Sequence, residues 1–273
     1  RLNRMLHVEV IKTGNEGNCY LITTDNPRFK ELKTSIMVDY GGYFLEKRDY
    51  SDLCAICLTH CHKDHVSGMA RLQKLHNYKL PVIGTYDELN APNVQKVLGI
   101  RRGEDVPLIY VEFPEIMQKS TPICMGNFVI FAARAYHDTA CPVHYWINDG
   151  EKSVFIVCDT SNLDDVALHL LEESDIVLIE SNYSRNVIRT NMIDGKKVEI
   201  VFVKSLKERI ITYGHLSNQD ITSILPHLVN AKVIVLTHIN EVLNSRSTME
   251  REIGKSERIK FCFAKDCPMK FVV

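Results

Sequence analysis

The chain has 273 residues, which suits one large domain or two small ones and is enough to bury a sizeable core. Hydrophobic residues make up 45% of it and charged residues 25%, as in an ordinary soluble globular protein. The formal net charge of −1 excludes a molecule-wide positive field that gathers nucleic acid non-specifically. This balance favours a small nucleotide as substrate, unless a local basic patch overturns it.

Nothing in the sequence predicts a membrane span or secretion. No apolar run approaches the roughly 18 residues needed to cross a bilayer, and the basic N-terminal residues 1–4 lack a signal-peptide core. The nine cysteines are scattered, and several lie inside apolar strands, which is typical of reduced thiols in a core. We therefore expect a cytoplasmic protein, in a bacterium or a phage-infected cell.

The predicted elements mix strands with helices along the chain. Runs rich in β-branched residues predict strands at 6–11, 19–23, 35–40, 53–58, 81–84, 108–113, 128–136, 143–147, 154–158, 176–179 and 232–236. Helical patterns fall at 66–77, 163–173, 217–229 and around 240–253. Asp64 and Ser217 are candidate N-caps, and Pro226 should kink or end its helix. No linker divides the chain, so we expect one α/β domain over residues 1–273.

The segment from Leu58 to His65 carries most of the chemistry. It reads Leu-Thr-His-Cys-His-Lys-Asp-His and places three imidazoles and a carboxylate within six residues, directly after an apolar strand. His60 and His62 are two apart, so their side chains leave the same face of an extended strand end. Asp64 and His65 then lead into the predicted helix. Such an arrangement offers two ligands to one metal ion and two to a second ion beside it, and these donors suit zinc best, with iron or manganese as weaker options.

This HxHxDH segment resembles the signature of the metallo-β-lactamase superfamily, whose members share an αββα sandwich. The other superfamily motifs are matched in order, each at the end of a predicted strand, by Asp39, His137, Asp159 and His238. The resemblance covers nearly the whole chain. It implies an α/β fold of the metallo-β-lactamase sandwich type.

A narrower resemblance is to the YycJ/WalJ branch of this superfamily, which is nuclease-like. It rests on segments 14–20, His137-Asp138, Pro142, 180–183 and 214–218. That branch is similar in turn to tRNase Z-type phosphodiesterases and to phage anti-Pycsar enzymes, which cleave cyclic nucleotides.

The chain departs from the branch pattern in three places. Asn15-Glu16 stands where Ser-Ser is expected, and His144 stands where Gly is expected before Tyr145. The segment 185–203 is also unlike the branch and is a candidate for a lid or a dimer contact. These departures bear on the substrate rather than on the metal chemistry.

The resemblance implies a site with two divalent ions, zinc or less favourably manganese. One ion is held by His60, His62 and His137, and the other by Asp64, His65 and His238, with Asp159 bridging. In the implied mechanism, a hydroxide shared by the two ions attacks phosphorus in line while the ions neutralise the growing charge. Asp39 is expected to orient a ligand histidine, to cap a turn, or both.

Further site residues are predicted outside the ligand set. The resemblance gives His215, together with Asp64, a catalytic role, because an imidazole before a helix start can contact phosphate or protonate the leaving oxygen. An ordinary loop histidine is the alternative. Ser217 and Asn218 are predicted to bind the same phosphate, although helix capping also explains Ser217. Asn182 and His144 are candidate substrate contacts, with packing as the alternative.

The sequence therefore predicts a dinuclear metal-dependent phosphodiesterase that hydrolyses nucleotide phosphodiester bonds, in a cyclic nucleotide or in DNA or RNA. The alternative is hydrolysis of a thioester, ester or lactam. Asp159 and segment 214–218 argue against a lactamase, and His62 argues against a flavodiiron-like redox role. A binding module without catalysis is disfavoured by the complete ligand set. We also expect a homodimer, because dimers are common among the enzymes that the chain resembles.

Overall fold

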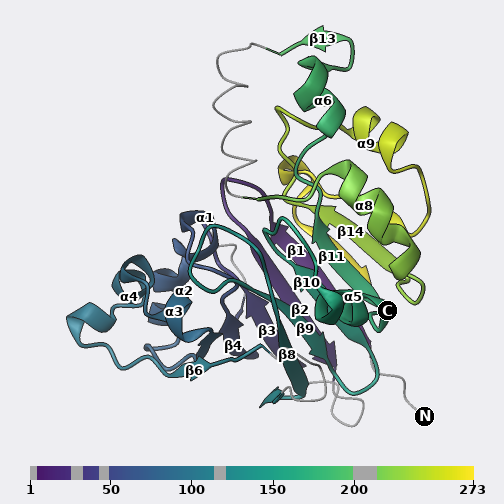
Figure 1. Ribbon diagram of the computed structural model, residues 1–273. Helices are drawn as coiled ribbons and strands as arrows, with labels where there is room; N and C mark the ends of the chain where they lie inside the picture. Colours follow the sequence, from purple (N-terminus) through teal and green to yellow (C-terminus); the bar gives the residue numbers. More distant parts are fainter. Residues whose placement is uncertain (1–4, 26–32, 43–48, 114–120, 199–213) are drawn as a thin grey trace.

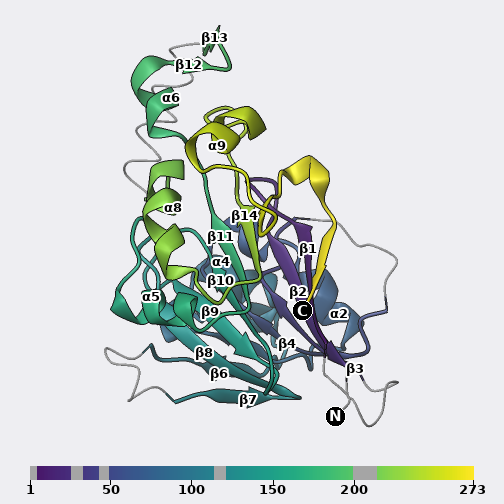
Figure 2. The ribbon, with the colours of Figure 1, turned by 90° about the vertical axis from the view of Figure 1, so that its right-hand side faces the viewer.

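The computed structural model describes residues 5–25, 33–42, 49–113, 121–198 and 214–273. Two seven-stranded sheets lie face to face, and helices cover the outer face of each sheet (Figures 1 and 2). This arrangement of four layers confirms the predicted α/β sandwich. None of the helices in these ranges is both long enough and apolar enough to cross a membrane.

The first sheet has the order β16-β1-β2-β3-β4-β5-β6. Its strands are β1 (Leu6–Lys12), β2 (Cys19–Asp25), β3 (Lys33–Val38), β4 (Leu53–Cys57), β5 (Val82–Gly84), β6 (Leu108–Tyr110) and β16 (Met269–Val272). From β3 to β6 the strands are parallel, and the remaining pairs are antiparallel.

The second sheet has the order β15-β14-β11-β10-β9-β8-β7. Its strands are β7 (Ile123–Met125), β8 (Phe128–Arg134), β9 (Val143–Asn148), β10 (Ser153–Val157), β11 (Ile176–Glu180), β14 (Val233–Thr237) and β15 (Ile259–Phe261). Strands β10, β11, β14 and β15 run parallel, so their carboxyl ends reach the same edge of the sheet.

The helices divide between the two outer faces. The first sheet is covered by α1 (Lys63–Val66), α2 (Met69–Leu75), α3 (Tyr86–Leu89) and α4 (Pro92–Val97), which is followed by the 3₁₀ turn η1 (Ile100–Arg102). The second is covered by α5 (Asp165–Glu172), α8 (Asn218–Ile224) and α9 (Arg246–Glu252). Helix α6 (Arg185–Thr190) and the hairpin of β12 (Met192–Ile193) and β13 (Lys196–Lys197) project from the sandwich (Figure 1).

Alternation along the strands separates the core between the sheets from the cores beneath the helices. In β10, Val154 and Ile156 pack between the sheets, whereas Phe155 and Val157 pack against the helices of the second sheet. Successive strand side chains point to opposite faces, so a strand buried on both faces must be apolar throughout. The continuous apolar runs recognised in the sequence therefore correspond to strands covered on both sides.

The structure confirms the predicted strands and corrects two features of the helices. The pattern at 66–77 is divided into α1 and α2 around Gly68, where a Cβ atom would lie 2.3 Å from the carbonyl oxygen of Gly42. The prediction of Asp64 as an N-cap is wrong, because α1 begins at Lys63 and has His62 at its N-cap position. Ser217 does cap α8, and Pro226 lies in the 3₁₀ turn η3 (Leu225–His227) that follows this helix.

Candidate metal centre

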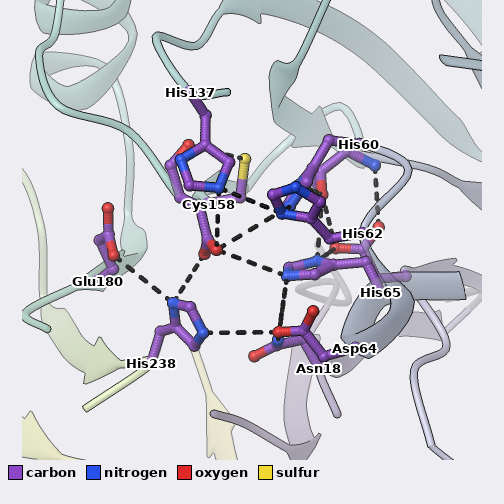
Figure 3. A network of polar contacts seen from close by, with 12 residues as sticks. Asn18, His60, His62, Asp64, His65, His137, Cys158, Glu180 and His238 are labelled. Carbon is purple, nitrogen blue, oxygen red and sulfur yellow. Dashed lines mark hydrogen bonds and ion pairs between the residues drawn. The ribbon is translucent and has the colours of Figure 1, made fainter. Parts of the chain in front are cut away.

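The predicted metal ligands come from both sheets and meet at one edge of the sandwich (Figure 3). Four of them follow β4 or lie in α1, and the other three follow β8, β10 and β14: His60, His62, Asp64, His65, His137, Asp159 and His238. Ligand sites in α/β proteins commonly form outside the carboxyl ends of strands, because chain segments that leave the sheet converge there. The two halves of the fold thus contribute to one cluster.

The first group of donors contains three histidines and Asp159. His62 Nδ1 lies 3.1 Å from His60 Nε2 and 3.3 Å from His137 Nε2. Asp159 Oδ2 lies 3.9 Å from His60 Nε2 and 3.7 Å from His137 Nε2. One donor atom from each of the four residues lies within 4.8 Å of all the others, which is the spacing of ligands around a single cation.

The second group contains Asp64, His65 and His238. Asp64 Oδ2 lies 3.6 Å from His65 Nε2 and 3.7 Å from His238 Nε2. Asp159 lies next to this group as well, because its Oδ2 is 3.8 Å from His65 Nε2 and its Oδ1 is 2.8 Å from His238 Nδ1. The donor atoms of both predicted sets therefore lie close together, with the carboxylate of Asp159 between them, and their role as ligands stays a prediction.

Two ligand histidines are oriented by partners on the far side of their rings. The Nδ1 atom of His65 lies 2.7 Å from the buried Asp39 carboxylate, which also accepts hydrogen bonds from the backbone N–H and the hydroxyl of Thr59. His137 Nδ1 lies 3.0 Å from the carbonyl oxygen of Gly214. Because each Nδ1–H is held in this way, the Nε2 atom of each ring faces the cluster and is the atom that can coordinate a metal ion. Asp39 is therefore placed to orient His65, and its role behind a metal ligand stays a prediction.

The cluster concentrates negative charge in a buried place. Burial alone would raise the pKa of Asp159, but His238 and His65 outweigh it and hold that pKa well below its usual value. Burial alone would lower the pKa of His65, but Asp39 and Asp64 raise it to about 9. Burial, reinforced by His65, keeps the pKa of His60 well below its usual value, which leaves a neutral imidazole.

Without metal, the histidines supply the positive charge beside these carboxylates, and divalent cations held by the same side chains would take that place. Imidazole nitrogens and carboxylate oxygens are donors that zinc accepts, and manganese accepts them less favourably. The mutually facing ring nitrogens of His60, His62 and His137 support the same conclusion, since a shared cation satisfies all three at once. The residues present thus fit a divalent metal centre.

A third group extends the cluster and includes a residue that the sequence did not single out. Glu180, the last residue of β11, lies with its Oε2 2.8 Å from His215 Nδ1 and 3.5 Å from His238 Nδ1. Its other oxygen accepts hydrogen bonds from the backbone N–H groups of Thr160 and Leu216. Figure 3 shows His238 between Glu180 and Asp64. Two signals were available: Glu180 is a charged residue at the end of an otherwise apolar strand, and it begins segment 180–183, which carries the YycJ/WalJ resemblance.

Asp138 is a second site residue that sequence reasoning missed. Its Oδ1 lies 3.1 Å from His137 Nε2 and 3.3 Å from His62 Nε2. The signals in the sequence were its position directly after a predicted ligand and its place in the His137-Asp138 segment that carries the YycJ/WalJ resemblance.

Four predicted substrate contacts are buried and engaged within the protein. Ser217 caps α8, and the side chain of Asn218 is hydrogen-bonded to Ser181, Asn244 and Glu252. Asn182 donates to the carbonyl oxygen of His238, and His144 accepts from the backbone N–H of Cys158. Their burial gives a substrate no access to these side chains, so a scaffolding role replaces the predicted contact.

A pocket of about 330 Å³ adjoins the cluster. It is lined on the cluster side by His137, Asp138 and Gly214, and elsewhere by Phe113, Arg134 and Tyr136 among others. His215 stays near the surface of the cluster, with 13% of its side chain exposed. The pocket therefore reaches the cluster at His137 and Asp138.

Curated relatives match nearly the whole chain. The exodeoxyribonuclease WalJ of Streptococcus pneumoniae is 24% identical over 263 residues, which cover 91% of this chain and 88% of WalJ. The exodeoxyribonuclease YycJ of Bacillus anthracis is 23% identical over 246 residues, which cover 86% of this chain and 83% of YycJ. The predicted likeness to the YycJ/WalJ branch is confirmed.

Solved structures share the fold. The metallo-beta-lactamase fold protein YhfI of Bacillus subtilis has a TM-score of 0.69 at 18% identity and covers 99% of this chain and 100% of its own. The short form of human tRNase Z has a TM-score of 0.62 at 14% identity, with 98% of both chains covered. The family described as "Beta-lactamase superfamily domain" matches residues 44–239, more than half of the chain. The chain therefore belongs to the metallo-β-lactamase superfamily.

Proposed function

We propose that this protein is a metal-dependent phosphodiesterase that hydrolyses phosphodiester bonds of DNA. The observation that carries the proposal is the convergence of the two ligand groups on Asp159, beside the Glu180–His215 pair. The names of the relatives WalJ and YycJ, both exodeoxyribonucleases, favour DNA as the substrate. We propose two ions per chain, zinc or manganese, with the ligand sets predicted from the sequence.

The proposed roles divide between binding metal and moving a proton. Divalent ions in these positions would activate a water molecule and neutralise charge on phosphate oxygens. His215 lies beside the ligands without belonging to either predicted set. Because Glu180 accepts from its Nδ1–H, the Nε2 atom of His215 can deliver a proton to the leaving oxygen. Asp64 contributes as a ligand, and its predicted catalytic role is limited to that contribution.

A cyclic nucleotide is the second candidate substrate. The net charge of −1 provides no general attraction for a polyanion, and the pocket beside His137 is small. These two observations favour a substrate with a single nucleotide unit. Hydrolysis of a thioester, an ester or a lactam is the remaining alternative.

One substrate panel separates these functions. Purified protein loaded with zinc or manganese is incubated with end-labelled DNA and RNA, cyclic nucleotides, nitrocefin and S-lactoylglutathione. We expect cleavage of DNA, which Asp159→Asn should reduce at least about a hundredfold by removing the shared ligand. The exposed His169 in α5 provides a control, since His169→Ala removes an imidazole away from the cluster. If metal-loaded protein turns over none of DNA, RNA and cyclic nucleotides, the protein is not a phosphodiesterase of this kind. Turnover of cyclic nucleotides without DNA would refute DNA as the substrate in favour of the second candidate.

Two further expectations accompany the proposed function. All nine cysteines lie in the described ranges as free thiols, which supports a reducing, cytoplasmic location. The homodimer stays a prediction, which light scattering of the purified protein can test. The segment predicted as a lid or dimer contact includes α6 and the β12–β13 hairpin, while its last residues, 199–203, lie outside the described ranges.

A further inference from the structure

The pocket beside the metal centre contains a cation that the proposed chemistry does not use. Arg134 is the last residue of β8 and lies three residues before His137. It lines the same pocket as His137 and Asp138, and its side chain is exposed. Of the pocket-lining residues that the structure describes, Arg134 alone carries a permanent positive charge.

Two aromatic rings hold the guanidinium group of Arg134 in place. Its Cζ atom lies 5.1 Å from the centre of the Tyr136 ring and 5.7 Å from the centre of the Phe113 ring. The Tyr136 ring is fixed in turn, because its hydroxyl donates to Asp164 over 3.3 Å and its backbone N–H donates to Thr160. Contacts of this kind position a guanidinium group while leaving its N–H donors available.

The carboxylates around the pocket are engaged elsewhere. Asp138 lies against the ring nitrogens of His62 and His137, and Asp164 accepts from Tyr136 and from the backbone N–H of Ala167. Within the described ranges, Arg134 forms no ion pair with a carboxylate at 4.0 Å or less. A positioned arginine with free donors beside a hydrolytic centre is suited to bind an anion of the substrate.

We propose that Arg134 binds a nucleotide phosphate in this pocket, next along the strand to the phosphate that is cleaved. The inference rests on the proposed function and names a binding site for it. Arginine pairs with phosphate through several N–H donors. The phosphate can be a terminal phosphomonoester or an internal phosphodiester, which share the same anionic oxygens.

A binding experiment tests the site without requiring turnover. The probe is a short single-stranded oligodeoxynucleotide with phosphorothioate linkages, prepared with a terminal phosphate at either end or with none. Affinities for metal-loaded protein are measured by fluorescence anisotropy. We expect Arg134→Gln to weaken binding about tenfold or more and Arg134→Lys to weaken it less, because lysine keeps the charge and loses the planar fork. Arg101→Gln, at an exposed arginine in η1, is the matched control.

The pattern across the probes identifies the phosphate. A loss confined to the phosphorylated ends assigns the site to a terminal phosphate, and an equal loss with all probes assigns it to an internal phosphodiester. Unchanged affinity of Arg134→Gln for every probe would overturn the proposal. Equal losses in Arg134→Gln and Arg101→Gln would overturn it as well, since both would then report only net charge.

A kinetic comparison separates this inference from the proposed function. Bis-p-nitrophenyl phosphate carries a phosphodiester but no neighbouring phosphate. We expect Arg134→Gln to lose at least tenfold more kcat/KM on DNA than on this small substrate, mainly through KM. Equal losses on both substrates, at normal metal content, would place Arg134 outside the proposed site. If wild-type protein cleaves neither substrate, the proposed function fails, and the binding data still decide the role of Arg134.

Discussion

At the scale of single residues, the centre pairs imidazoles with carboxylates for two different purposes. Asp39 is fully buried behind His65 and orients this predicted metal ligand. Glu180 is equally buried, but its main partner is His215, which belongs to neither ligand set. Burial alone would raise the pKa of Glu180, and His215 outweighs it and lowers that pKa. An ionised Glu180 stabilises the protonated form of His215, which is the form that can donate to a leaving oxygen.

Glu180→Gln should therefore impair catalysis more than substrate binding. A glutamine can keep part of the hydrogen bonding but cannot stabilise a cationic His215. We expect kcat to fall about 10- to 100-fold with a smaller change in KM, as is typical when a residue that orients a functional imidazole is removed. The measurement is steady-state DNA cleavage at saturating metal, together with the metal content of the variant.

The chain provides a matched control for this variant. Glu172 forms the same kind of pair with His227, at 2.8 Å, but on the surface, where both side chains are about 40% exposed. Glu172→Gln should leave kcat unchanged. The metal content of Glu180→Gln could instead fall in proportion to its activity. Glu180 would then act by holding the ligand geometry around His238 rather than by supporting proton transfer.

At the scale of elements, local patterns predict the strands and much of the site. The HxHxDH ligands are close in sequence, and the other ligands follow long apolar strands, so both signals are local. The short strands β7, β15 and β16 were not predicted, because runs of three or four residues carry little periodicity. Their positions depend on pairing with distant partners, such as β16 with β1. The role of Glu180 depends in the same way on a loop more than thirty residues later.

The division of the predicted 66–77 helix has an equally non-local cause. The chain after β3 passes directly over α1, where the backbone N–H of Tyr40 donates to the carbonyl oxygen of His65 and that of Gly68 donates to the carbonyl oxygen of Tyr40. The residue before β2 meets the same helix, because the backbone N–H of Asn18 donates to the carbonyl oxygen of Asp64. A Cβ atom on Gly41 would lie 1.5 Å from the carbonyl oxygen of Asp64. Only a glycine allows this approach, which holds the two ligands of α1 against the strand ends.

Gly41→Ala should therefore displace α1 and weaken the metal centre. We expect a loss of about 3 kcal/mol in the free energy of unfolding, the upper range for overpacking, because backbone rather than a flexible side chain must move. Chemical denaturation and metal analysis are the measurements. Gly103→Ala is the control, since a Cβ there meets nothing within 4 Å and only the left-handed backbone, with φ of 86°, opposes it.

The two variants should differ in metal binding as well as in stability. Gly103→Ala should cost about 1–2 kcal/mol and leave the metal content unchanged. Equal metal content in both variants would mean that the contact between Gly41 and α1 does not position Asp64 and His65.

At the scale of the whole molecule, the metal centre joins the two sheets. Four of its predicted ligands belong to the first half of the sandwich and three to the second, and the carboxylate of Asp159 lies beside donors from both halves. Without cations, the buried carboxylates of Asp39, Asp159 and Glu180 and the partly exposed carboxylate of Asp64 gather at this seam, each against a histidine. Bound metal should therefore stabilise the sandwich as well as supply chemistry, since any ligand that binds only the folded state raises the free energy of unfolding.

Removal of metal should lower the melting temperature. Each ion present at one hundred times its Kd adds about 2.7 kcal/mol, and for a chain of this size 1 kcal/mol corresponds to roughly 2–4 °C. Chelation of wild-type protein should therefore lower Tm by about 5 °C or more for each ion lost, as measured by calorimetry. Asp159→Asn, which lacks the shared ligand, should respond less to the chelator, and His169→Ala should respond like wild type. The contradicting outcome is a protein that carries two ions per chain before chelation and has the same Tm with and without the chelator. Bound metal would then add nothing to the free energy of unfolding of the sandwich.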